Sequence, residues 1–255
     1  MKPIIVENPS APNAIGDTLA AFPALHAKAW DSPISVYLSA SSCRELLYHP
    51  KITQLTEKPE SGHHLNIQTL FSQYANSGLS MPQAYMMELG LTSLAKSHYI
   101  PEIILDTQNI KSDKKYDFLL SPYSHSDFGT NTKVWPEYSW VLLAQELARN
   151  NLKVGLLGTS NDKDYPALEP LCEPILDLPL VDVCRLVEAA SCVISVDNGI
   201  NWITQGMRTN HILLLPGTQH PNWSANRNFN GVNLPLSATT QIVFAAIQRL
   251  MQGIY

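Results

Sequence analysis

Short apolar runs alternate with segments of helical periodicity along the chain, most regularly in its second half. The apolar runs are typical of buried strands and lie at residues 4–6, 34–40, 115–123, 152–158, 192–197 and 210–217. Apolar residues at helical spacing predict helices over residues 18–30, 42–49, 136–151, 181–190, 199–207 and 239–252. Strands that alternate with helices of about 10 to 15 residues indicate parallel, doubly wound sheets. The predicted fold class is therefore α/β.

The first half of the chain is patterned less regularly than the second. Residues 51–66 are polar and predict an irregular segment, whereas residues 67–98 predict helical pieces that break at Gly78 and Pro82. Residues 100–106 fit either a further strand or an extended connector. The pattern therefore predicts the elements of this half only in outline.

A polar, charged segment at residues 111–115 (KSDKK) is the best candidate for a linker. It predicts an N-terminal α/β domain over residues 1–110 and a C-terminal α/β domain over residues 111–235. Residues 236–255 contain a terminal helix with an apolar face, and this face needs cover from another part of the protein.

Composition narrows the choice of function class. The chain has 255 residues and a net charge of −5, which gives no electrostatic indication of binding to nucleic acid or an anionic membrane. No segment approaches the ~18 apolar residues that a membrane-spanning helix needs, and the first residues do not resemble a signal peptide. The four cysteines lack C-x-x-C spacing and are expected to be reduced thiols. We expect a cytoplasmic protein, with peripheral contact to a membrane left open.

Asp197, Asn198 and Gly199 lie where the apolar run at 192–197 meets the predicted helix at 199–207. The start of a helix presents free backbone N–H groups, which together with the helix dipole favour a phosphate. Gly199 allows close backbone approach, Asn198 can donate to a phosphate oxygen, and Asp197 can accept hydrogen bonds from a sugar hydroxyl. The alternative is that Asp197 and Asn198 only cap the helix.

Two further strand ends carry polar residues. After the run at 115–123, the hydroxyls of Tyr123 and Ser124 precede a loop that leads to Lys133, just before the next helix. A lysine at this place suits a phosphate contact, although a solvated charge is the alternative. Near the N-terminus, Asp17 lies at the turn between the first strand and the first helix, where it is either a functional carboxylate or an N-cap.

The sequence does not favour a metal site. Asp162-Lys163-Asp164 resembles the D-x-D that holds a metal in many sugar transferases, but it follows a strand in a polar loop and fits a solvated acidic turn better. The histidines show no H-x-x-x-H spacing on a helix. We therefore expect no bound metal and no cofactor.

Taken together, three motifs resemble one family. They are GD-x-L-x-x-x-PAL from Gly16, K-x-WP-x-x-x-W from Lys133 and VD-x-G-x-x-x-x-T from Val196. In this order and at these strand ends they are similar to the ADP-heptose:lipopolysaccharide heptosyltransferases, glycosyltransferase family 9. The segment ELLYHPKITQL is similar to a further stretch of that family.

This resemblance implies the GT-B fold, with two Rossmann-like domains facing a cleft and a C-terminal helix that returns to the N-terminal domain. That domain is shorter here than in the family, and it is expected to bind the acceptor, a glycan or another hydroxyl compound. The donor would be a nucleotide-sugar, most simply an ADP-sugar, and transfer would be inverting and independent of metal. Asp17 falls on the family's general base and Lys133 on the lysine that stabilises the pyrophosphate.

The remaining family positions belong to the donor site. Tyr123 and Ser124 match a hydroxyl pair near the phosphates, and Leu178 lies where the base packs. An acid on the ribose corresponds to Asn161 or Asp162. The other donor-binding residues implied by the resemblance are Asp197, Asn198, Gly199 and Trp202.

Two residues depart from the family pattern, because Asn198 replaces a serine or threonine and Trp202 replaces a histidine. Loss of the histidine removes a donor or proton carrier, so a second interpretation is a degenerate relative that binds a nucleotide-sugar without transferring it, or an enzyme subunit. Retention of Asp17 and Lys133 argues against it. A third interpretation, epimerisation or hydrolysis of a nucleotide-sugar, needs an additional acid/base pair that the sequence does not reveal.

Overall fold

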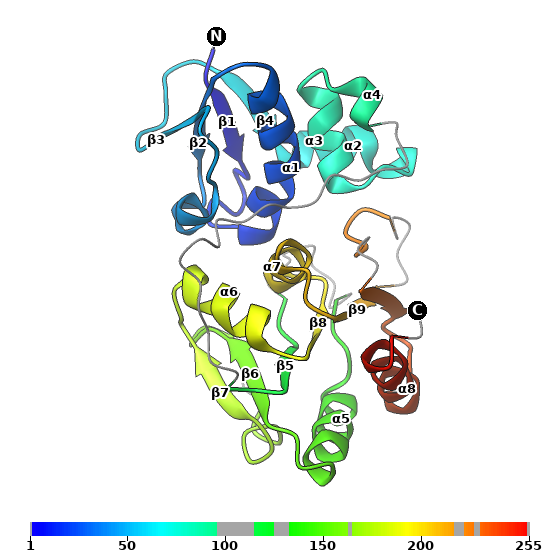
Figure 1. Ribbon diagram of the computed structural model, residues 1–255. Helices are drawn as coiled ribbons and strands as arrows, with labels where there is room; N and C mark the ends of the chain where they lie inside the picture. Colours follow the sequence, from blue (N-terminus) through cyan, green and yellow to red (C-terminus); the bar gives the residue numbers. More distant parts are fainter. Residues whose placement is uncertain are drawn as a thin grey trace. The chain divides into compact units, whose positions relative to one another are not determined.

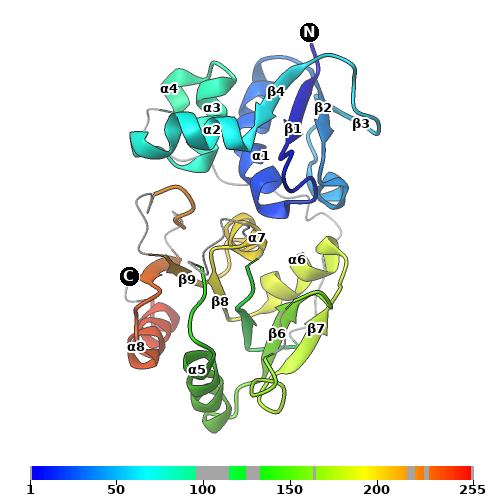
Figure 2. The same cartoon turned by 180° about the vertical axis from the view of Figure 1, so that it is seen from behind.

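The protein consists of two α/β units, each built on a parallel sheet (Figures 1 and 2). The computed structural model describes residues 2–95, 115–124, 133–162, 165–216, 222–226 and 230–253. Unit 1 comprises Met1–Asn109 with Asn222–Ser224, and unit 2 comprises Ile110–Pro221 with Ala225–Tyr255. The α/β prediction is confirmed. The boundary expected at residue 110 and the connector at 100–106 lie outside the described residues.

Unit 1 has a four-stranded sheet in the order β3-β2-β1-β4, in which all three neighbouring pairs are parallel. Its strands are β1 (Ile4–Glu7), β2 (Ile34–Leu38), β3 (Ile52–Leu55) and β4 (His63–Asn66). Its helices are α1 (Ile15–Asp31), α2 (Ile67–Tyr74), α3 (Met81–Glu88) and α4 (Thr92–Ala95), with short 3-10 helices at Ser41–Leu46 and Ala75–Ser77.

The expectation of an irregular segment at residues 51–66 is wrong, because β3 and β4 lie there. Both are edge strands with mostly partly exposed or exposed side chains, so neither needs an apolar run. Gly62 allows β4 to approach β1, since a Cβ atom there would lie 2.7 Å from the carbonyl oxygen of Pro3. The expected breaks further along are confirmed: Gly78 has a φ of 77°, and Pro82 lies in the first turn of α3.

Unit 2 has a six-stranded parallel sheet in the order β10-β9-β8-β5-β6-β7. Its strands are β5 (Phe118–Ser121), β6 (Val154–Gly158), β7 (Glu173–Leu176), β8 (Cys192–Val196), β9 (His211–Leu215) and β10 (Gly231–Pro235). Its helices are α5 (Glu137–Arg149), α6 (Leu180–Ala189), α7 (Gly199–Met207) and α8 (Thr240–Met251), with α5 beside α8 and α6 beside α7 (Figure 1).

Helices cover both faces of this sheet, which explains the continuous apolar runs in its central strands. Phe118 and Leu120 of β5 join the core formed with α5 and α8, whereas Leu119 is buried on the opposite face because side chains alternate along a strand. A strand that is buried on both faces consists mainly of apolar residues, and its few polar side chains find partners inside the protein, as Ser195 of β8 does with His211 of β9 at 2.8 Å. This is the pattern that the sequence shows at β5, β6, β8 and β9.

The C-terminal helix α8 belongs to unit 2. It contacts α5, β9 and β10 of this unit. Val243, Ala246, Ile247 and Leu250 on its apolar face are buried in the same core as the central strands of that unit. The face thus finds its cover within its own domain. The expected return of α8 to the N-terminal domain stays a prediction.

Candidate functional site

In the sheet of unit 2, the order in which successive strands are added reverses beside β5. From β5 the chain continues to β6 and β7 on one side, and then returns to β8 and β9 on the other. In open α/β sheets the crevice at the carboxyl ends of the strands next to such a switch point is the usual place for a ligand. The segments that follow β5 and β8 contain Tyr123, Ser124, Asp197, Asn198 and Gly199, so the structure brings these predicted site residues together.

Lys133 and Asp197 form an ion pair at the carboxyl ends of these strands, with 2.8 Å between Lys133 Nζ and Asp197 Oδ2. Asp197 is buried, at 7% exposure, whereas Lys133 remains partly exposed. The motif around Lys133 explains how the lysine is held. Trp135 is buried against Trp140 and donates its indole N–H to the carbonyl of Ala238 at 3.0 Å, which fixes the chain two residues beyond Lys133.

The side chain of Asn198 is engaged at both ends. Its Oδ1 accepts a hydrogen bond from the backbone N–H of Ile200 and caps α7, while its Nδ2 donates to Ser121 Oγ at 2.9 Å and to the carbonyl of Tyr123 at 2.7 Å. The amide therefore caps the helix, which is the alternative left open by the sequence. Because both amide hydrogens are taken up within the protein, the expectation that Asn198 donates to a phosphate is not supported.

Tyr123 and Asp162 lie together next to the end of β6. The ring of Tyr123 packs so close to Gly158 that a Cβ atom there would lie 2.7 Å from its Cε2, and it contacts Tyr165 with ring centroids 5.3 Å apart. Asp162 Oδ2 accepts hydrogen bonds from the backbone N–H and the hydroxyl of Thr159. A small cavity of about 70 Å³ is lined in part by Tyr123, Thr159, Asp162 and Tyr165.

The other four predicted donor-site residues of unit 2 differ in how far they are exposed and in what they contact. Ser124 donates its hydroxyl to the carbonyl of Asp197 at 3.3 Å, which ties the segment after β5 to the start of α7. Asn161 is exposed in the turn after β6, and Leu178 is 39% exposed beside a surface depression along β7 and α6. Trp202 is only 3% exposed, so its indole ring is largely inside the protein.

Asp17 lies in unit 1, in the first turn of α1, which follows the carboxyl end of β1. The N-cap of this helix is Ala14, so Asp17 is not the capping residue, and that alternative is wrong. Its Oδ2 accepts a hydrogen bond of 2.6 Å from the amide of Asn8, and its backbone carbonyl accepts one of 2.9 Å from the hydroxyl of Tyr85 on α3. Burial raises the pKa of Tyr85 well above its ordinary value, and the charge of Asp17 adds to this effect.

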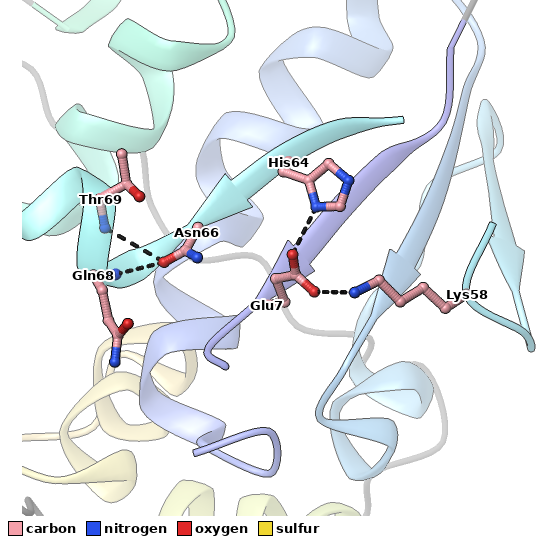
Figure 3. Close-up of polar contacts among 6 residues, drawn as sticks. All are labelled: Glu7, Lys58, His64, Asn66, Gln68 and Thr69. Carbon is pink, nitrogen blue, oxygen red and sulfur yellow. Dashed lines mark hydrogen bonds and ion pairs between the residues drawn. The ribbon is translucent and has the colours of Figure 1, made fainter. Parts of the chain in front are cut away.

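A second group of polar side chains lies at the carboxyl end of β1 in the same sheet (Figure 3). Glu7 at the end of β1 lies between His64 Nδ1 at 2.6 Å and Lys58 Nζ at 2.5 Å. Although partial burial opposes it, hydrogen bonds from Lys58 and His64 hold the pKa of Glu7 below its ordinary value. Sequence reasoning missed Asn8 and Glu7, and the only signal for them was their place directly after an apolar run.

Two structural absences concern the part of the chain that the structure describes. Its His, Cys, Asp and Glu residues form no group of three or more that could hold a metal ion. None of its helices combines the length and the apolar character needed to span a bilayer. The D-x-D candidate is only partly described, since residues 163 and 164 lie outside these ranges.

Comparison with family models gives one match, Glycosyltransferase family 9 (heptosyltransferase), over residues 47–249. This span covers more than half of the chain. Comparison with curated protein sequences finds no match.

Several solved structures share the fold at low sequence identity. ADP-heptose lps heptosyltransferase II of E. coli is 13% identical with a TM-score of 0.68, and the match covers 99% of each chain. Heptosyltransferase WaaC of E. coli, solved with ADP-2-deoxy-2-fluoro heptose, is 15% identical with a TM-score of 0.62, covering 98% of this chain and 99% of that one. TibC of enterotoxigenic E. coli is a dodecameric iron-containing heptosyltransferase, solved in complex with ADP-D-beta-D-heptose. It is 14% identical with a TM-score of 0.72, and the match covers 100% of this chain and 77% of the TibC chain. The two parallel-sheet domains therefore have the GT-B fold of these enzymes.

Proposed function

The chain belongs to glycosyltransferase family 9, the heptosyltransferase family, and is a glycosyltransferase; on this premise we propose that it moves a heptose-like sugar from a nucleotide-sugar to an acceptor hydroxyl. The transfer inverts the anomeric centre and requires no metal ion. An ADP-sugar is the favoured donor, because solved relatives of this fold carry ADP-heptose or its analogue. The acceptor is a glycan or another hydroxyl compound of lipopolysaccharide biosynthesis, on the cytoplasmic side where nucleotide-sugars are made.

One observation carries the mechanism: Asp17 is not used as the cap of α1, and its carboxylate is held by Asn8 at the carboxyl edge of the unit 1 sheet. In the proposed reaction Asp17 takes the proton of the acceptor hydroxyl while the hydroxyl oxygen forms a bond to the anomeric carbon. The bond between that carbon and the diphosphate oxygen breaks, and the nucleoside diphosphate leaves with the electron pair.

Unit 2 binds and stabilises the leaving diphosphate in this proposal. Lys133 supplies a positive charge there, and α7 supplies backbone N–H groups that begin at Gly199. A lysine and a helix N-terminus together can replace a divalent cation at a diphosphate, which supports independence from metal. Asn198 contributes by setting the start of α7, and its side chain makes no direct contact with the donor in this proposal.

The nucleoside is proposed to lie along the strand ends beside Lys133. The cavity lined by Tyr123 and Asp162 suits the ribose, with Asn161 at its rim, and exposed Leu178 offers an apolar surface to the base. Ser124 and Asp197 are placed near the phosphates and the donor sugar. Trp202 shapes this region from inside the domain, since its ring is buried.

The substitution Asp17→Asn tests the proposal, because it keeps the shape of the side chain and removes its basicity. Transfer from ADP-heptose to heptose-free lipopolysaccharide should fall by about 10²- to 10⁴-fold, the usual contribution of general-base catalysis. Donor affinity, measured by calorimetry, and the melting temperature should stay close to those of the unmodified protein. Asp31→Asn, at the exposed far end of the same helix, is the matched control and should transfer normally.

Two results would contradict the proposal. If Asp17→Asn transfers the sugar as fast as the unmodified protein, this carboxylate is not the general base. Failure of the unmodified protein to transfer from ADP-, UDP-, GDP- and CDP-sugars, despite stabilisation by one of them, favours the binding-only interpretation. A ligand held at 100 times its Kd should stabilise the protein by about 2.7 kcal/mol, so binding is readily detected by thermal shift.

A further inference from the structure

The turn after β1 is organised by the side chain of Asn8. Its Oδ1 accepts hydrogen bonds from the backbone N–H groups of Ser10 at 3.1 Å and Ala11 at 3.2 Å. Since backbone N–H groups can only donate, these contacts identify the oxygen end of the amide. Nδ2 is therefore the end that points to Asp17 and donates to Oδ2 at 2.6 Å.

The turn itself is anchored to the rest of unit 1. The amide of Gln68 on α2 donates to the hydroxyl of Ser10, and the carbonyl of Asn8 accepts from the N–H of Ala11 at 3.1 Å. Asn8 is thus fixed through its backbone carbonyl, through its side-chain Oδ1 and through the contact of nearby Ser10 with α2. A donor held in this way keeps its direction toward Asp17 and loses little side-chain entropy when it forms the bond.

The backbone of Asp17 is fixed from other directions. Tyr85, fully buried on α3, donates its hydroxyl to the Asp17 carbonyl, and its raised pKa keeps that hydroxyl protonated. From the 3-10 helix at Ser41–Leu46, the thiol of Cys43 contacts the carbonyl of Ile15 at 3.9 Å. The position of the Asp17 backbone and the direction of its carboxylate are therefore held by different groups, and Asn8 acts on the carboxylate.

We propose that Asn8 is a positioning residue, which orients the Asp17 carboxylate and favours its ionised form before the acceptor binds. This inference rests on the proposed function, in which Asp17 accepts the acceptor's proton. A hydrogen bond from a neutral donor to a carboxylate stabilises the charged state relative to the protonated acid. Asn8 neither gives nor takes a proton in the reaction. Its effect is that Asp17 stays a base at lower pH and keeps one geometry.

The experiment compares Asn8→Ala, Asn8→Asp and the control Asn66→Ala. Asn8→Ala removes the donor, whereas Asn8→Asp keeps an oxygen for the turn and places a second carboxylate against Asp17. Asn66 is the matched control because it builds the same kind of turn in the same unit, capping α2 through the N–H groups of Gln68 and Thr69 (Figure 3). It pairs with Glu7 across the sheet and has no contact with Asp17 among the described hydrogen bonds.

The first measurement is independent of activity. The carboxyl signal of Asp17 is followed against pH by carbon NMR and assigned by its loss in Asp17→Asn. We expect its titration midpoint to rise by about one pH unit in Asn8→Ala, the size of one charge-assisted hydrogen bond, and further in Asn8→Asp. In Asn66→Ala the midpoint should not move, although the melting temperature falls.

The second measurement is the pH profile of kcat with ADP-heptose and heptose-free lipopolysaccharide. In each Asn8 variant the acidic limb should move to higher pH together with that variant's titration midpoint, further in Asn8→Asp than in Asn8→Ala, with KM for the donor unchanged. An unmoved midpoint and an unmoved limb in both Asn8 variants overturn the inference, even where Asp17→Asn is inactive and the proposed function stands. A moved midpoint together with a fully active Asp17→Asn instead rejects the catalytic role of Asp17.

Discussion

The ion pair of Lys133 and Asp197 shows how single residues in this protein depend on distant partners. Each residue was assigned a ligand contact from its place between a strand and the next helix, but the structure joins the two directly. Because Asp197 is buried, removal of the lysine leaves a carboxylate with reduced access to water and without its counter-charge. A substitution at Lys133 therefore changes both the free energy of unfolding and the affinity for the donor.

Substitution of both partners separates these two effects. Lys133→Met should lower the free energy of unfolding by about 1–3 kcal/mol, because it leaves the Asp197 charge unpaired. Adding Asp197→Asn should recover most of this loss, whereas affinity for ADP should stay reduced in the double variant. Urea denaturation and calorimetry with ADP measure the two quantities. If the double variant is no more stable than the single one, the pair does not contribute in the way described.

Among the elements, the junction of β8 and α7 is held by one side chain. Asn198 caps α7 and also donates to Ser121 and Tyr123 after β5, so it links two neighbouring strand ends. The sequence offered the cap as one of two alternatives, since asparagine before a helix is a common signal. It did not predict the link, because nothing in the local pattern shows that β5 is the neighbour of β8.

Asn198→Ala should therefore cost more than the loss of an ordinary cap. An N-cap contributes about 1 kcal/mol, and loss of the two amide donors should bring the decrease in unfolding free energy to about 2 kcal/mol or more. Asn198→Ser keeps a cap acceptor but lacks the second amide function, so it should fall in between. Thr239→Ala, which removes the cap of α8, is the control in denaturant unfolding. Equal losses in Asn198→Ala and Thr239→Ala would count against the link.

The elements that the pattern predicted and those that it missed differ in one physical respect. The strands β5, β6, β8 and β9 are covered by helices on both faces and appear as apolar runs. The four strands that the pattern missed are β3, β4, β7 and β10, and these are the edges of the two sheets. Edge strands need only one pairing neighbour and retain polar, exposed side chains, so periodicity does not reveal them.

At the scale of the whole molecule, α8 belongs to the core of unit 2. The apolar face of this helix was evident from the sequence, but the choice between the two domains was taken from a family resemblance. In the structure Ile247 is 3% exposed within the unit 2 core, and Ile242 on the same helix is 50% exposed. The stability of unit 2 therefore depends on the end of the chain.

A pair of substitutions on α8 tests this arrangement. Ile247→Ala should lower the free energy of unfolding of unit 2 by about 2–5 kcal/mol, as expected for a cavity in a packed core. Ile242→Ala should change it by less than about 0.5 kcal/mol, because the side chain is half exposed. Hydrogen exchange of the β8 and β9 amides reports on unit 2 directly. Loss of protection in β1 and β2 instead of β8 and β9 would place the helix with the other unit.

The sequence by itself determined the fold class, the central strands and the strand-to-helix connections that carry Asp17, Lys133 and Asp197. These features are local, because a strand or helix has to match the burial of its own faces wherever it lies. Only the tertiary structure decided the edge strands, the cover of the apolar face of α8 and the partners of the site residues. The contacts of Asn8 with Asp17, of Lys133 with Asp197 and of Asn198 with the end of β5 join segments that are separated along the chain. Such hydrogen bonds and ion pairs depend on which strands become neighbours, and no local period of apolar residues encodes that choice.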